Sequence, residues 1–72
     1  MLSECYCEKI VIEFIDGYKA KWEPNKNVVK YKVIFGKDIM EIRAVPDNSN
    51  CTFIGRDVIR QIKTYGWQSC ND

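Results

Sequence analysis

The sequence predicts a small α+β domain: an antiparallel β-meander of four strands, with room for a fifth, covered on one face by a single C-terminal helix. Between residues 9 and 45, apolar and polar residues alternate, which is the period of a half-buried strand. After residue 53, apolar residues recur three or four apart, as they do on one face of a helix. A chain of 72 residues has room for one domain, so residues 1–72 are treated as a single unit.

Residues 9–14 and 18–23 are predicted to form the first hairpin. The apolar residues of both strands hold the even positions, and Gly17 can supply the left-handed residue of a three-residue loop. A loop of this length places Glu13 opposite Lys19, whereas a two-residue loop would set the lysines against the apolar face. The three-residue loop is therefore preferred.

Two further strands are predicted over residues 28–35 and 39–45, after a dense Pro-Asn turn signal. Gly36 and Lys37 suit a two-residue type II′ turn between them. The odd positions of the third strand and the even positions of the fourth then face the core. Residues 51–53 are a candidate for a short fifth strand.

The helix is predicted between Gly55, an acceptable N-cap, and Gly66, which stands where a left-handed residue ends a helix. Trp67 is expected to pack back on the last turn. The apolar residues of one helix face are Ile54, Val58, Ile59, Ile62 and Tyr65. A helix with such a face has to cover the sheet, which gives a two-layer α+β domain.

The residue types present argue against an enzyme. The chain contains no histidine, so it has no Ser-His or Cys-His nucleophile pair. Its four glycines stand at the boundaries of the predicted elements, so no phosphate-binding loop is present. A domain of this size also has little room for a substrate cleft. We expect no catalytic residues and no cofactor.

The cysteines leave three alternatives: free thiols, disulfides or a Cys₄ zinc site. They are Cys5, Cys7, Cys51 and Cys70. Zinc ligands usually come in close pairs, and here Cys51 and Cys70 are isolated, so no metal site is expected. The sequence shows no secretory signal and no apolar stretch of the roughly 20 residues that span a bilayer. These absences favour a cytoplasmic protein with free thiols and no membrane association.

The sheet face that the helix leaves open is the candidate binding surface. Pairing along the predicted meander brings Lys21, Lys30 and Arg43 side by side, with no acid among them. Three adjacent cations suggest an anionic partner, either a phosphate or a protein carboxylate. A solvated face that discourages aggregation is the alternative interpretation.

Two aliphatic pairs share this open face. The predicted registers set Val28 opposite Val45 and Ile34 opposite Ile39. Such pairs exceed the scattered exposure of a wet surface and indicate a subunit or partner interface. The alternative is that the loop over residues 46–50 or the C-terminal tail covers them.

The preferred function is a protein-interaction domain that binds a protein with an acidic or mixed surface and forms a homodimer. Small regulators and inhibitors, including those carried by phage and mobile elements, have this general form. A four-stranded meander followed by a helix is also similar in outline to the PC4-like single-stranded DNA binders, which dimerise. That resemblance rests on topology and implies nucleic-acid binding as the second choice. A net charge of +1 favours the protein partner, as does the lack of an aromatic among the cations, because Tyr18, Trp22 and Tyr31 are assigned to the core.

Overall fold

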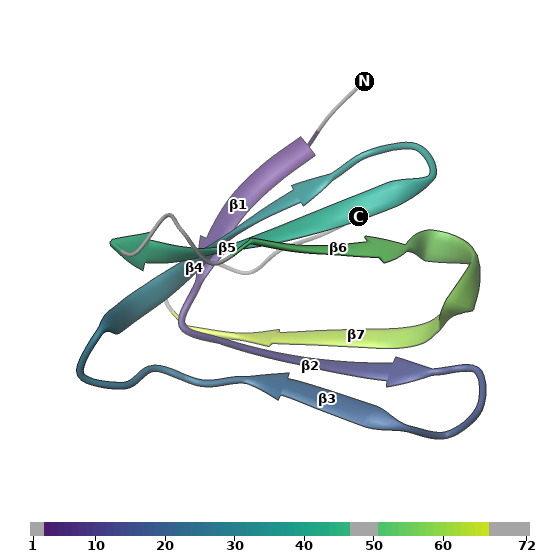
Figure 1. The fold of residues 1–72 in the computed structure, drawn as a ribbon, viewed down its shortest axis with the longest axis horizontal. Coiled ribbons are helices and arrows are strands. Elements are labelled where there is room, and N and C mark those ends of the chain that lie inside the picture. Colours follow the sequence, from purple (N-terminus) through teal and green to yellow (C-terminus); the bar gives the residue numbers. More distant parts are fainter. Residues whose placement is uncertain (1–2, 47–50, 67–72) are drawn as a thin grey trace.

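The protein is all-β, so the predicted α+β class is wrong. A computed structural model describes residues 3–46 and 51–66, and these form seven strands in two antiparallel sheets, with no α-helix. Figure 1 shows the two sheets lying one over the other. In those two ranges, no helix is long and apolar enough to cross a membrane.

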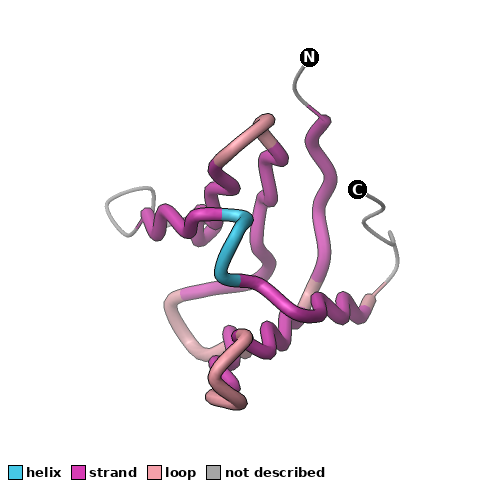
Figure 2. The backbone as a smooth tube through the Cα atoms, turned by 90° about the vertical axis from the view of Figure 1, so that its right-hand side faces the viewer, coloured by secondary structure: helices cyan, strands magenta, loops and turns pink. Residues whose placement is uncertain are grey.

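The four-stranded sheet has the order β1-β4-β5-β6, formed by Ser3–Cys7, Val28–Phe35, Ile39–Pro46 and Cys51–Gly55. The three-stranded sheet has the order β3-β2-β7, formed by Lys19–Trp22, Lys9–Phe14 and Ile59–Tyr65. Glu8 alone separates β1 from β2, so the chain passes from one sheet to the other at that residue. It returns to the four-stranded sheet between β3 and β4, over residues 23–27, and crosses again to the three-stranded sheet through a single 3₁₀ turn, Arg56–Val58, drawn in cyan in Figure 2.

The first hairpin has the predicted register. Glu13 lies opposite Lys19, and the Phe14 N–H donates to the carbonyl of Tyr18 at 2.8 Å. Gly17 closes the three-residue loop with φ +94°, a conformation that costs a side-chain-bearing residue about 1 kcal/mol or more. The loop length and its glycine are therefore confirmed.

The strand order of the meander is wrong, because β3 does not pair with β4. The N-terminal strand β1, absent from the prediction, takes the place beside β4, with Cys5 opposite Val33. Cys5 and Cys7 point into the core, which gives this strand its apolar face. Strand β3 is left as an edge of the other sheet.

The second hairpin keeps its predicted faces but not its predicted partners. The turn is centred on Lys37 and Asp38, one residue later than expected, so Ile34 lies opposite Glu41 and not Ile39. A turn moved by one residue moves every partner by two, which leaves the same side chains facing the core. Arg56 holds this turn: its N–H donates to the Asp38 carbonyl at 2.8 Å, and its Nη1 donates to the Gly36 carbonyl at 2.7 Å.

The last segment is a strand and not the predicted helix, and a β-bulge in it accounts for the helix-like spacing of Ile59 and Ile62. Ile62 lies opposite Ile12, but Ile59 lies opposite Phe14, so Arg60 is an extra residue in β7. The bulge lets Ile59 and Ile62, three positions apart, both pack against the core. In the sequence this spacing is indistinguishable from one helical turn.

A second bulge moves Val28 from the open face into the core. Val28 lies opposite Pro46 and Lys30 opposite Val45, which leaves Val29 as the extra residue of β4. Val28 is accordingly buried, while Val29 is 69% exposed. The predicted pairing of Val28 with Val45 on an open face is therefore wrong.

The core lies between the two sheets. Its buried side chains are Cys5, Cys7, Ile10, Ile12, Val28, Tyr31, Val33, Phe35, Met40, Ile42, Ala44 and Ile54. Tyr31 is buried as expected, and its hydroxyl donates to the Glu23 carbonyl at 2.7 Å. Tyr18, which we assigned to the core, is 65% exposed and stacks on Phe14.

Gly66 ends β7 where the prediction ended a helix. Its φ of +127° is left-handed as expected, and a Cβ there would come within 2.8 Å of the Glu8 backbone nitrogen. The Glu8 N–H also donates to the Tyr65 carbonyl at 2.8 Å, so the end of β7 packs on the β1–β2 junction. The predicted packing of Trp67 lies outside the described residues.

Candidate functional site

The predicted binding residues divide between three places. Val28 is buried, and Lys21 belongs to the other sheet, so the row Lys21, Lys30, Arg43 does not form. The remaining five share the outer face of the four-stranded sheet, the face that points away from the core. They are Lys30, Ile34, Ile39, Arg43 and Val45.

Two cross-strand rows occupy the middle of this outer face. The first row runs through Tyr6, Lys32, Arg43 and Cys51. The second row runs through Glu4, Ile34, Glu41 and Phe53. Cations in one row therefore stand next to carboxylates in the other.

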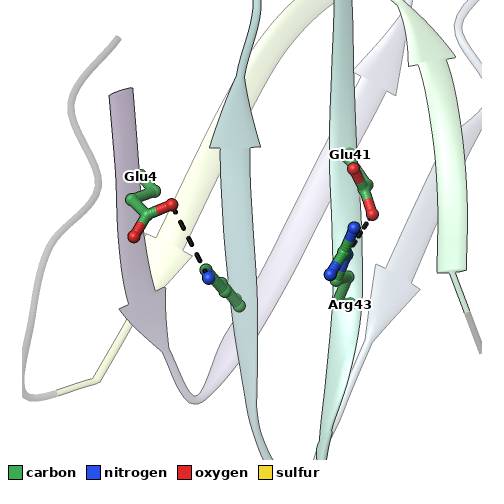
Figure 3. Close-up of polar contacts among 4 residues, drawn as sticks. Glu4, Glu41 and Arg43 are labelled. Carbon is green, nitrogen blue, oxygen red and sulfur yellow. Dashed lines mark hydrogen bonds and ion pairs between the residues drawn. The ribbon is translucent and has the colours of Figure 1, made fainter. Parts of the chain in front are cut away.

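These neighbouring charges form ion pairs within the face. Lys32 Nζ lies 3.6 Å from a carboxylate oxygen of Glu4, and Arg43 Nε donates a hydrogen bond to Glu41 (Figure 3). That hydrogen bond is the main cause that raises the pKa of Arg43 above its usual value. Two of the cations on this face are thus already neutralised by the sheet itself.

The third cation, Lys30, lies over an aromatic ring. Its Nζ is 4.7 Å from the centroid of Tyr6, within the range of a cation–π interaction. With Lys32, Arg43 and Val45, these two residues line a shallow hollow. Tyr6 is not among the predicted binding residues because β1 was not predicted, although the spacing of Cys5 and Cys7, two apart, would place Tyr6 on the opposite face of a strand.

An apolar group occupies the other end of the outer face. Phe53 is 66% exposed and Ile39 is 52% exposed. Phe53 lies opposite Glu41, two residues along β5 from Ile39, and Ile34 lies on the far side of Glu41. The sequence had indicated Ile34 and Ile39 but not Phe53, because it did not predict which side chains of residues 51–53 face the core.

The cysteines differ from one another. Cys5 belongs to a disulfide, so the preference for free thiols is wrong at that residue. Cys7 and Cys51 keep their thiols outside any disulfide; Cys7 is fully buried, and burial raises its pKa to about 11. A thiol held protonated in this way is a poor nucleophile. The prediction for Cys70 lies outside the described residues.

Within residues 3–46 and 51–66, no three His, Cys, Asp or Glu side chains stand close enough together to hold a metal ion.

Comparison with other proteins adds no relative. No family model matches the chain, and no similar protein was found among the curated proteins or the solved structures. The resemblance to the PC4-like DNA binders also fails, because it needs a helix where residues 59–65 form β7. The class that the fold defines is a small all-β domain of two antiparallel sheets.

Proposed function

We propose that this chain is a non-enzymatic protein-binding domain whose contact surface is the outer face of the four-stranded sheet. The observation that carries the proposal is the exposure of Phe53 and Ile39 beside charges that are already paired. Large apolar side chains on a sheet face lose contact with water only when a partner covers them.

The side chains of this face suit a protein better than a polyanion. Aromatic residues and arginine are enriched in the centres of protein interfaces, and Tyr6, Phe53 and Arg43 all lie here. A phosphate backbone would have to displace the carboxylate of Glu4 from Lys32 and that of Glu41 from Arg43. A protein with a mixed surface can keep those pairs and bury the apolar end.

A second copy of the chain is one such partner. In a symmetric dimer the same face meets itself, so it has to be complementary to itself in charge. The outer face carries both signs, with Glu4 and Glu41 in one row and Lys32 and Arg43 in the next. Two copies related by a two-fold axis can therefore set each acidic row against the partner's basic row.

The test replaces the two exposed apolar residues together, as Ile39→Ser with Phe53→Ser. Loss of an interface centre costs about 2 kcal/mol or more, so association should weaken by at least roughly 30-fold. Sedimentation measures self-association, and capture with purified, nuclease-treated protein measures other partners. Circular dichroism should be unchanged, because neither side chain is in the core.

The matched control is Ile15→Ser with Tyr18→Ser. These two residues are as exposed as the first pair, at 59% and 65%, but lie at the tip of the first hairpin. Association should survive this change. If the wild-type chain is a monomer that captures no protein, or if both pairs weaken association equally, the proposal is wrong.

A further inference from the structure

The outer face of the three-stranded sheet is a second, separate surface, and its charge is one-sided. Its outward side chains are Lys9, Val11, Glu13, Lys19, Lys21, Gln61, Lys63 and Tyr65. Four of these are lysines and one is an acid. From this arrangement we propose that the face binds the phosphates of single-stranded nucleic acid.

The lysines of this face differ from the cations of the four-stranded sheet in their partners among the described residues. The single acid, Glu13, is engaged by Arg60, whose Nη1 lies 3.6 Å from its carboxylate. Lys19, Lys21 and Lys63 form no ion pair within residues 3–46 and 51–66. On the four-stranded sheet, by contrast, Lys32 and Arg43 are paired with carboxylates.

The spacing of the lysines follows from the strand pairing. Lys21 lies opposite Val11, and Val11 lies opposite Lys63, so the two ammonium-bearing chains flank one small apolar residue. Neighbouring strands are about 4.8 Å apart, which puts the two backbones about 10 Å apart. Val11 and Lys63 also line a shallow depression with Glu13, Lys19 and Gln61. The sugar-phosphate backbone of an extended single strand can lie along such a surface, with Lys21 on one side of it and Lys63 on the other.

One end of the face carries an aromatic ring beside a cation. Tyr65 is 47% exposed, and Lys9, directly opposite it, holds its Nζ 5.2 Å from the ring centroid. Surfaces that bind single strands combine cations that follow the backbone with aromatic rings on which bases stack. Tyr65 is the ring that this face offers for stacking.

Two features of this face favour single-stranded nucleic acid over an acidic protein or a duplex as the ligand. Lysine is depleted in protein interfaces, and Val11 is the one aliphatic residue among the outward side chains of this sheet. A duplex is read by a helix or ribbon that enters a groove, whereas unstacked bases can lie on an open sheet. The β3-β2-β7 face is such a sheet.

The test is the salt dependence of binding to a fluorescein-labelled oligothymidine of about 12 nucleotides, measured by anisotropy. Each phosphate contact contributes about 0.7 to the log–log slope for single strands, so Lys21→Gln with Lys63→Gln should reduce the slope by about 1.4. The matched control is Lys26→Gln with Lys37→Gln, which removes the same charge from exposed loop positions. The control should leave the slope within experimental error of the wild-type value.

A third variant tests stacking. Tyr65→Leu should weaken binding by roughly 5- to 150-fold while the slope stays unchanged, because it removes a ring and no charge. Ile39→Ser with Phe53→Ser, the pair that tests the proposed protein interface, should not affect the oligonucleotide. The two proposals can therefore fail independently.

Four results would each overturn this inference. They are no binding of the oligonucleotide even at low salt, equal loss of slope in the control pair, tighter binding of a duplex of the same length, and binding of anionic phosphatidylserine vesicles without binding of the oligonucleotide.

Discussion

The two sheets differ on both of their faces. Most buried apolar side chains belong to the four-stranded sheet, whereas the three-stranded sheet contributes Ile10 and Ile12 from its central strand. On the outer face of the larger sheet, Lys32 and Arg43 are paired with carboxylates, and Phe53 and Ile39 are exposed. On the smaller sheet, Lys19, Lys21 and Lys63 form no ion pair with any residue in the ranges 3–46 and 51–66. In a domain of this size, a few inward side chains attach the smaller sheet to the core, and its outer face can carry a different chemistry.

The largest expected effect tests how much the three-stranded sheet depends on β2. Ile12 and Ile42 are both almost completely buried, one in each sheet. Ile12→Ala and Ile42→Ala should each lower the free energy of unfolding by about 2–5 kcal/mol, measured by denaturant titration. Where the alanine variants do not fold, the valine variants should each cost about 0.5–1.5 kcal/mol. A much smaller cost at Ile12 would show that the smaller sheet packs loosely on the larger one.

A second prediction contrasts the inner and outer faces of the four-stranded sheet through its free thiols. Burial raises the pKa of Cys7 from 9.0 to about 11, so the unfolded chain loses this proton first. The stability due to the buried thiol is therefore complete below about pH 9 and is lost as the pH rises towards 11, by up to about 2–3 kcal/mol. Burial also raises the pKa of Tyr31, so the interval just above pH 9 reports on Cys7 best.

The control for this prediction is the exposed thiol. Cys51→Ala should keep the same loss of stability above pH 9, whereas Cys7→Ala should reduce it. In the native protein a thiol reagent should modify the exposed Cys51 and spare the buried Cys7, which should react only on unfolding. Cys5 should react only after reduction. Rapid labelling of Cys7 under native conditions would contradict its burial.

The smallest expected effect compares the charges of the two outer faces. Glu41→Gln removes the partner of Arg43 and should lower the unfolding midpoint slightly, and this shift should shrink with added salt. Lys21→Gln reduces the mutual repulsion of the four lysines on the outer face of the three-stranded sheet, so it should instead stabilise the fold slightly at low salt. Unfolding midpoints at low and high salt measure both. If both substitutions shifted the unfolding midpoint in the same direction, the proposed electrostatic difference between the two faces would be wrong.

The sequence predicted the strands well wherever the period of two was unbroken. The first hairpin, the inward positions of β4 beyond its bulge and those of β5, and a fifth strand over residues 51–53 all agree with the structure. Two larger errors, the placement of Val28 on the open face and the prediction of a helix over residues 59–65, have the same cause. The bulges at Val29 and Arg60 add a residue, so the apolar side chains on either side stand three apart. Only pairing across strands distinguishes that spacing from a helix.

The candidate surface was predictable only in part for a related reason. Five of its residues follow from the alternation within β4 and β5, which the sequence shows directly. Tyr6 and Lys21 depend on which strands are neighbours, and the sequence does not reveal that β1, and not β3, lies beside β4. Strand order is decided by burial of Cys5 and Cys7 against the core, a property of the assembled sheets.

The pairing of β2 also has a consequence for the order of folding. On one side β2 meets β3 across a three-residue loop, but on the other side Lys9 has to find Tyr65. The local hairpin can form within microseconds, whereas contacts so far apart in the chain make folding slow. Until residues 59–65 are in place and Arg56 has turned the chain back, Ile10 and Ile12 lack one of their neighbouring strands. During synthesis the first half of this protein is therefore a sheet with an open edge, and the risk of aggregation is greatest at that stage.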